Sequence, residues 1–168
     1  LSALAGTSGT VKRYAVKSAT ADLEGSIGEF TSYSSSVDAV VDWFGPTSFQ
    51  RMDECGSKMR HNDPTSPESS LIGGPIQENL DKVALADPIT YVDKDDPPFL
   101  ILHGDGDELV PACQSKDLYD ALQKKKVRSE FILVPHAGHG PGLFEEMYFK
   151  KMTEFFWGFM VGSVLLIM

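Results

Sequence analysis

Two acidic residues and two histidines in the second half of the chain have the types and spacing for acid–base chemistry. Asp105 and Asp107 follow one short apolar run, and His136 and His139 follow a later one. A carboxylate can hold an imidazole ring in one tautomer, and the ring can then move a proton to or from a reacting group. The pattern therefore predicts a histidine base oriented by an acid.

Both apolar runs have the character of buried strands. Each run is short and is bounded by Pro and Gly, which is typical of parallel strands covered on both faces. The acidic and histidine loops would then lie at the carboxyl ends of the strands, where ligands gather in open α/β sheets. With the amphipathic segments between them, the fold class is α/β. We predict parallel strands over 37–44, 98–103 and 129–135, and helices near 114–126 and 144–157.

Other segments are less regular. Residues 1–9 have the spacing of a short helix that ends at a glycine, and residues 11–36 are polar and predict a surface connection. Residues 47–97 form a long proline-containing insert, in which 78–86 is the best helical candidate. The chain becomes almost wholly apolar from Phe155, but this run is shorter than the about 20 residues that a membrane span needs.

The loop sequences carry a resemblance. The pattern His103-Gly-x-x-Asp107-x-x-Val-Pro111, followed by Gly138-His-Gly140, resembles the acid and histidine loops of the α/β-hydrolase superfamily. It is most similar to bacterial esterases of the acetylxylan- and feruloyl-esterase-like group, which residues 66–75 resemble as well. The resemblance implies one partial α/β-hydrolase domain over 1–168, its C-terminal portion, with a cap-like insert at about 47–97. The resemblance does not account for the apolar tail 158–168, for which a foreign tail, a buried helix end and a weak membrane contact stay open as alternatives.

The same resemblance implies roles for two residues. Asp107, the fourth residue after His103, matches the orienting acid, and His139, between two glycines, matches the general base. Asp105 is expected to be a solvated or turn residue, and His136 is the rival base. Both histidines could also be ordinary loop residues.

A metal site is a further alternative for these four side chains. Asp-x-Asp together with histidines can bind cations, but no second set of ligands at a recognised spacing supports it. We expect no metal and no cofactor.

The nucleophile is expected before Leu1. Residues 1–7 resemble the helix that follows the Gly-x-Ser-x-Gly motif of these esterases. Ser8 lies in a Gly-x-Ser context, but Thr10 replaces the second glycine and no strand precedes it, as a nucleophile elbow requires. On this interpretation the chain supplies an acid and a base, and it is inactive alone.

Two hypotheses of different classes follow. The first is the C-terminal part of a serine carboxylic-ester hydrolase that acts on a small-molecule or polysaccharide-linked acyl ester. The second is a non-catalytic fragment or binding domain. Peptidases and dienelactone hydrolases share this half of the fold, so a peptidase is a further alternative.

The composition limits the classes of partner that the protein can bind. The net charge of −9 argues against nucleic acid and against an anionic membrane surface. The two cysteines, Cys55 and Cys113, are too few for a disulfide scaffold, so free thiols are the simpler expectation. One disulfide between them would fit an exported protein. Localisation stays open, with secretion or the periplasm as alternatives, and so does the oligomeric state.

Overall fold

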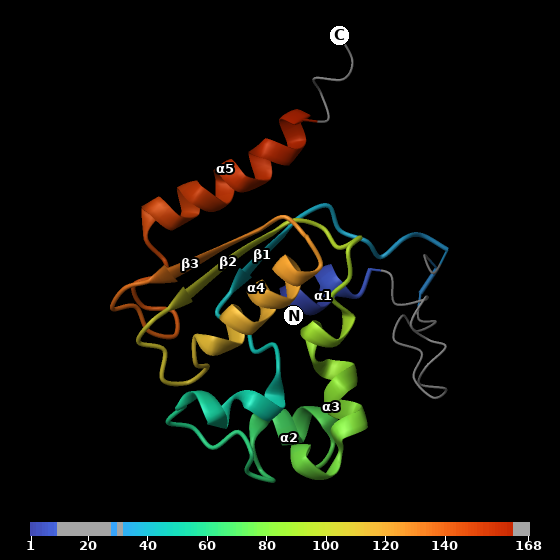
Figure 1. Cartoon of the computed structure of the whole chain (residues 1–168), viewed down its shortest axis with the longest axis vertical. Coiled ribbons are helices and arrows are strands. Elements are labelled where there is room, and N and C mark those ends of the chain that lie inside the picture. The colour runs from blue at the N-terminus through green and yellow to red at the C-terminus, as the bar shows by residue number, and fades with distance from the viewer. Residues whose placement is uncertain (10–27, 30–31, 163–168) are drawn as a thin grey trace.

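Three parallel strands form the sheet that carries the acid and histidine loops. The computed structural model describes residues 1–9, 28–29 and 32–162. The strands are β1 (Val40–Trp43), β2 (Phe99–Gly104) and β3 (Ser129–Val134), and they lie side by side in that order (Figure 1). Phe99 pairs with Val40 on one side and with Ser129 on the other. The predicted α/β class with parallel strands is confirmed.

The position of the central strand, β2, accounts for its apolar sequence. Every residue of β2 is buried, because strands flank it on both edges and helices cover both faces. A strand in this position has no solvent side, so it shows a continuous apolar run instead of alternation.

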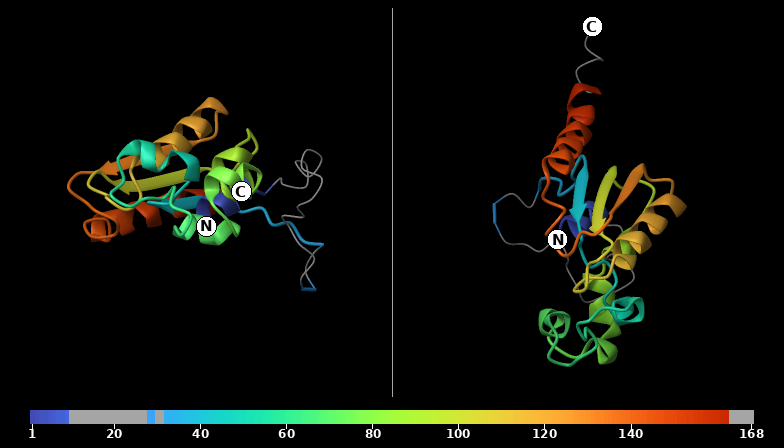
Figure 2. Two further views of the ribbon diagram at one scale, coloured as in Figure 1. Left: turned by 90° about the horizontal axis from the view of Figure 1, so that it is seen from below. Right: turned by 90° about the vertical axis from the view of Figure 1, so that its left-hand side faces the viewer.

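Helices cover the two faces of the sheet (Figures 1 and 2). α1 (Ser2–Thr7) and α4 (Cys113–Lys124) pack on one face, around the buried side chains of Val40, Phe99 and Ile101. α5 (Glu146–Gly162) packs on the other face, over Leu100 and Leu102. α5 also extends beyond the sheet.

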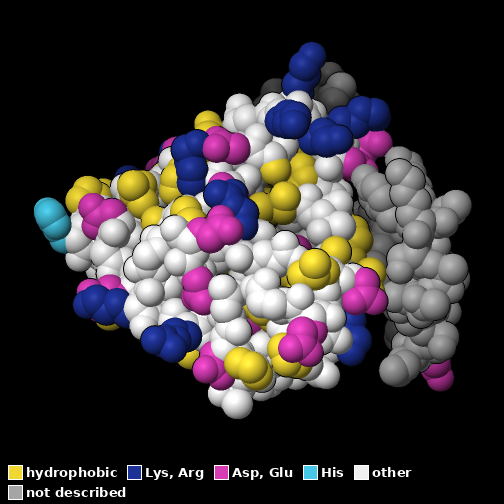
Figure 3. Space-filling view, turned by 60° about the horizontal axis from the view of Figure 1, so that its bottom comes forward, with side chains coloured by type: hydrophobic (Ala, Val, Ile, Leu, Met, Phe, Trp, Pro, Cys, Tyr) yellow, Lys and Arg dark blue, Asp and Glu magenta, His cyan; other side chains and the backbone are white. Residues whose placement is uncertain are grey.

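The insert between β1 and β2 is made of short helices gathered beyond one end of the sheet (Figure 1). A small apolar core lies around Phe49, Met52, Ile76 and Val83 of the insert and includes Val110 of the acidic loop. Charges of both signs lie among apolar side chains on the face that carries it (Figure 3). The elements are η2 (Phe49–Arg51), η3 (Asp53–Cys55), α2 (Pro67–Ile72), η4 (Ile76–Glu78), α3 (Leu80–Ala86) and η5 (Pro88–Tyr91).

The element ends differ from the predicted ones. β1 begins three residues later than predicted, and it ends at Trp43 because Phe44 adopts a positive φ of 46° that a strand cannot contain. The predicted helix over 144–157 begins at Glu146 and continues to Gly162. The predicted surface connection over 11–36 and the end of the tail fall largely outside the described residues. Within the described residues, no helix is long and apolar enough to cross a membrane.

The cysteines are paired. Cys55 of η3 and Cys113 at the start of α4 form a disulfide between residues 58 positions apart. The simpler expectation of free thiols is therefore wrong, because the folding of the insert brings its first part onto the start of α4. The bond fixes the insert next to the acidic loop.

Candidate active site

Asp107 lies in the tight loop after β2, and its two carboxylate oxygens have different partners. Oδ1 accepts hydrogen bonds from the backbone N–H groups of Leu109 at 3.0 Å and Val110 at 2.9 Å. These local hydrogen bonds occupy Oδ1 and leave Oδ2 directed away from the loop backbone. The side chain is buried.

The second oxygen of Asp107 meets the histidine loop. Asp107 Oδ2 lies 2.7 Å from His139 Nδ1, a hydrogen bond between residues 32 positions apart. Since a carboxylate only accepts, Nδ1 of His139 donates, and Nε2 is left free of the proton in the neutral ring. The His139 side chain is 32% exposed, whereas the Asp107 side chain is 0% exposed. The pair can therefore present a basic nitrogen at the surface of the loop.

A buried histidine supports the acidic loop from inside. His103, at the end of β2, has both ring nitrogens bonded: Nε2 to the carbonyl of Val110 at 2.8 Å and Nδ1 to Ser115 Oγ at 2.7 Å. Burial lowers the pKa of His103. A neutral ring that donates from Nε2 and accepts at Nδ1 satisfies both contacts. Its Nε2 also lies 3.3 Å from Asp107 Oδ2.

The other two candidates contact each other through the backbone. The N–H of His136 donates to Asp105 Oδ1 at 2.6 Å, and both residues are exposed. His136 has a φ of 60°, so it sits at the turn out of β3. Asp105 thus acts as a turn residue that bonds the backbone of His136, whereas Asp107 bonds the ring of His139.

The acidic and histidine loops touch at a glycine. A Cβ on Gly104 would lie 2.2 Å from the carbonyl oxygen of Ala137, far inside contact distance. Next to it, Gly106 N–H donates to the same oxygen at 2.9 Å. In the histidine loop, Gly140 has a φ of 107°, which favours glycine.

Aromatic side chains lie beside the base. The ring of Phe44 lies 4.5 Å from that of His139, and it meets Phe144 at 6.0 Å. Trp43 stacks on Phe144 at 5.2 Å. Phe44 is also in the strained conformation that ends β1, and such conformations persist where the surroundings fix them, commonly at functional sites. Phe44 therefore restricts one side of the imidazole.

Asp42 connects α1 to the sheet next to this region. It is buried in β1, and Ser2 Oγ donates to its Oδ1 at 2.8 Å. Burial raises the pKa of Asp42. The hydrogen bond secures the first turn of α1 against the strand whose end carries Phe44.

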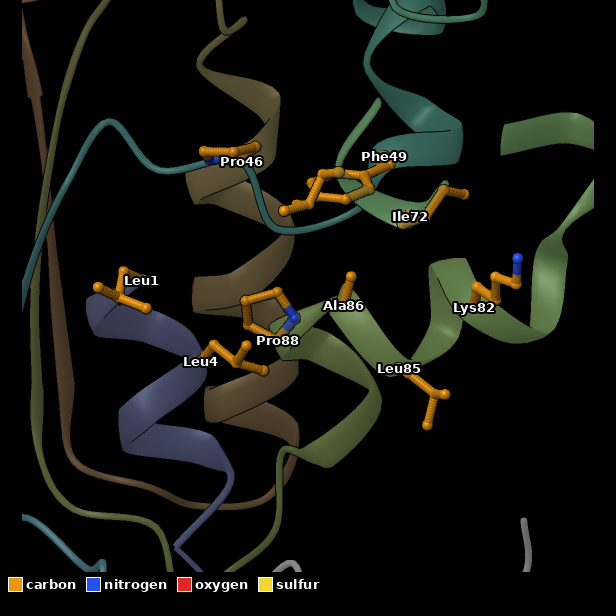
Figure 4. A pocket seen from close by; sticks show the side chains of 10 residues that line it. Leu1, Leu4, Pro46, Phe49, Ile72, Lys82, Leu85, Ala86 and Pro88 are labelled. Atoms are coloured by element: carbon orange, nitrogen blue, oxygen red, sulfur yellow. The ribbon is translucent and has the colours of Figure 1, made fainter. Parts of the chain in front are cut away.

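An apolar cavity of about 620 Å³ opens between α1 and the insert (Figure 4). Its lining includes Leu1, Leu4, Pro46, Ile72, Ala86 and Pro88. Neither Asp107 nor His139 lines it. The cavity is therefore separate from the acid–base pair.

Metal ligands do not gather at this site. In the described part of the chain, no group of three or more His, Cys, Asp or Glu side chains could hold a metal ion. The four candidates separate into two contacts of one acid and one histidine each.

Sequence reasoning missed the supporting residues. The interpretation used His103 only as part of a pattern, and the contacts of Ser115 and Phe44 join residues that are distant in the sequence. The signal for His103 was present, because a histidine at the end of an all-buried strand must find partners for both nitrogens.

Comparison with known proteins gives a consistent result. The family model described as BD-FAE matches residues 1–122. Among curated proteins, the probable carboxylic ester hydrolase LipM of Mycobacterium tuberculosis (strain ATCC 25618 / H37Rv) is 31% identical over 88 residues, which are 52% of this chain and 20% of LipM.

Two solved structures are more similar. A truncated form of a carbohydrate esterase from gut microbiota is 46% identical with a TM-score of 0.80, and the match covers 93% of this chain and 54% of that one. The bifunctional GH43-CE of Bacteroides eggerthii is 48% identical with a TM-score of 0.80, over 92% of this chain and 21% of that one. The chain thus spans about half, or less, of the length of these relatives, and its fold is that of α/β-hydrolase esterases.

Proposed function

The chain belongs to the BD-FAE family, and we propose that it supplies the acid and the base of a serine carboxylic-ester hydrolase. Asp107 is the proposed orienting acid and His139 the proposed general base. The observation that supports this most directly is the 2.7 Å hydrogen bond between Asp107 Oδ2 and His139 Nδ1. On this proposal, residues 1–168 are one partial α/β-hydrolase domain, and the insert 47–97 is its cap.

The chemistry follows from the geometry of the pair. With Nδ1 donating to Asp107, the Nε2 of His139 can accept the proton of a serine hydroxyl as that oxygen attacks an ester carbonyl. The charged ring is stabilised by the carboxylate, and it returns the proton to the leaving alcohol. The Oδ1 of Asp107 accepts two backbone hydrogen bonds, so Oδ2 is the oxygen that holds the ring.

The position of the nucleophile is also part of the proposal. In the described part of the chain, no serine hydroxyl hydrogen-bonds with His139. We propose that the nucleophile lies on a segment that precedes Leu1 in a longer protein, as the relatives' greater length allows. The substrate class that fits is an acyl ester, either of a small alcohol or of a polysaccharide, because the relatives are a carboxylic ester hydrolase and carbohydrate esterases.

A fusion enzyme tests the proposal. The part of the gut-microbiota carbohydrate esterase that precedes the matched region is joined to residues 1–168, and turnover of a short-chain aryl ester is measured. We expect His139→Ala to lower kcat by several orders of magnitude, about 10⁴-fold or more, because triad members act as a unit. His136→Ala is the matched control and should keep most of the activity.

Three outcomes would contradict the proposal. Equal losses for His136→Ala and His139→Ala would remove the assignment of the base. A folded fusion that turns over neither aryl esters nor acetylated xylan would favour a non-catalytic fragment, and turnover of a peptide anilide alone would favour a peptidase.

A further inference from the structure

A short segment of the insert packs on the loop that holds Asp107. The hydroxyl of Ser57 donates to the carbonyl of Leu109 at 2.9 Å, and His61 Nε2 lies 2.9 Å from the same oxygen. A carbonyl oxygen can only accept, so Nε2 of His61 carries a proton and donates. Lys58 N–H donates to the carbonyl of Glu108 at 3.0 Å.

These carbonyls belong to the two peptide groups that bind the acid. In the first, the carbonyl of Glu108 accepts from Lys58, and the N–H of Leu109 donates to Asp107 Oδ1 at 3.0 Å. This peptide group therefore lies between the insert on one side and the carboxylate on the other.

The second peptide group is arranged in the same way. The carbonyl of Leu109 accepts from Ser57 and His61, and the N–H of Val110 donates to Asp107 Oδ1 at 2.9 Å. A peptide group whose oxygen accepts hydrogen bonds is polarised and becomes a stronger donor at nitrogen. Ser57 and His61 thus act on the acid through one peptide group.

His61 is itself firmly held. The residue is 1% exposed, and its backbone N–H donates to Asp53 Oδ1 at 2.8 Å. Its Nδ1 lies 3.0 Å from Glu68 Oε1, an ion-pair distance, although the two atoms are not aligned as a hydrogen bond. Burial and the contact of Nε2 with the Leu109 carbonyl therefore limit the positions that the ring can take.

The spacing of Ser57, His61 and Glu68 resembles a second triad, since Ser57 Oγ lies 3.0 Å from His61 Nε2. The hydrogen bonds argue against that role. Ser57 gives its proton to the Leu109 carbonyl and accepts from the N–H of Met59 at 3.1 Å. Because Nε2 of His61 is a donor to the same carbonyl, it cannot remove the serine proton.

We propose that Ser57 and His61 are positioning residues for Asp107. They hold the peptide group between Leu109 and Val110, which binds Oδ1, so that Oδ2 is kept toward His139. The inference rests on the proposed function for the role of Asp107, and it adds that the insert helps to build the acid–base pair. In consequence, the insert is a part of the catalytic machinery and not only a cover over the substrate.

NMR spectroscopy of the 168-residue chain tests this proposal. The variants His61→Leu and Ser57→Ala are compared with Ser66→Ala, a control that removes the cap of α2 but leaves the loop contacts in place. We expect amide hydrogen exchange at Val110 to accelerate about tenfold in His61→Leu, the loss of roughly one buried hydrogen bond. The control should leave it near the wild-type rate.

A spectroscopic signature accompanies the exchange rates. The Hδ1 proton of His139, assigned by its loss in His139→Gln, is deshielded while it bonds to Asp107. It should shift upfield in His61→Leu and Ser57→Ala and stay in place in the control. Ser57→Ala removes only a hydroxyl, so it carries the test if His61→Leu fails to fold.

The proposal is overturned if Val110 exchanges at the same rate in His61→Leu, or in Ser57→Ala, as in Ser66→Ala. This result is independent of the fusion enzyme. Full activity of the His139→Ala fusion would instead contradict the proposed function, while the exchange rates would still show whether the insert holds the Asp107 loop.

Discussion

Asp107 differs from Asp105 in where its carboxylate oxygens find partners. The side chain of Asp107 turns back on its own loop and bonds the N–H groups two and three residues later, which leaves Oδ2 for His139. Asp105 is two residues earlier, and it bonds the backbone of the histidine loop instead. The two acids are separated by one glycine but have different roles. Asp107 orients the ring of His139, and Asp105 stabilises the turn at His136.

A buried acid outside the site makes stability depend on pH. Asp87, at the start of η5, accepts from the N–H of Phe49 at 3.1 Å, and burial raises its pKa from 3.8 to about 6. Its folded pKa lies above its unfolded value, so the folded state binds the proton more tightly. The contribution of Asp87 to the free energy of unfolding is fully present below about pH 4 and is lost as the pH rises to about 6.

We expect Asp87→Asn to remove this dependence. Between about pH 4 and pH 6, the free energy of unfolding of the wild type should fall by on the order of 2 kcal/mol relative to the variant. Urea denaturation of both proteins across this range measures the difference. Asp96, whose pKa burial raises to about 7, is present in both proteins and cancels. The same pH dependence of the free energy of unfolding in both proteins would contradict the expectation.

At the scale of elements, the active-site geometry depends on how closely two loops approach. The end of β2 and the loop after β3 touch where Gly104 faces the carbonyl of Ala137. Both contacting groups are backbone, so neither can rotate away. The disulfide between η3 and α4 and the hydrogen bonds of Ser57 and His61 then hold the acidic loop from its other side.

Gly104→Ala should therefore force the loops apart. The added Cβ would lie 2.2 Å from the Ala137 oxygen, and we expect a loss of stability of about 2 kcal/mol or more, typical of overpacking against rigid neighbours. The Hδ1 signal of His139 should shift upfield as well, since its bond to Asp107 spans the two loops. Thermal unfolding and NMR measure the two effects.

Gly138→Ala is the matched control for that substitution. Gly138 lies in the histidine loop, next to His139, and apart from its two chain neighbours a Cβ there would meet no atom within 4 Å. Gly138→Ala should leave both the stability and the Hδ1 signal of His139 close to their wild-type values. A Gly104→Ala protein as stable as the control would show that the loops can separate without cost.

For the whole molecule, we expect the 168-residue chain to show no serine-hydrolase turnover above background. In the described part of the chain, no hydroxyl is bonded to His139, and loss of the nucleophile costs about 10⁶-fold in a triad enzyme. Ser8 follows the last residue of α1 and ends that helix. A nucleophile needs the strand-to-helix turn that this position does not have.

Incubation with a short-chain aryl ester and with a fluorophosphonate probe measures this. Covalent labelling of any serine, with turnover that disappears when that serine is changed, would contradict the expectation. The active fusion enzyme is the positive control, since it contains the same acid and base.

Sequence patterns alone were sufficient for the fold class, the three strands and the two flanking helices, and the resemblance of the two loops to α/β-hydrolases selected Asp107 and His139 as the candidate pair. These depend on local signals: apolar runs bounded by Pro and Gly, helical spacing of apolar residues, and loop motifs at the ends of strands. Each signal lies within a few residues of the feature that it predicts.

Only the tertiary structure decided the rest. The disulfide, the Gly104 contact, the ring of Phe44 against His139 and the support of Asp107 by Ser57 and His61 all join residues that are distant along the chain. The sequence around His61 contains no sign of its partner, because the Leu109 carbonyl is a backbone group that every residue carries. Such contacts are set by how the insert folds back onto the sheet, and no local pattern encodes that.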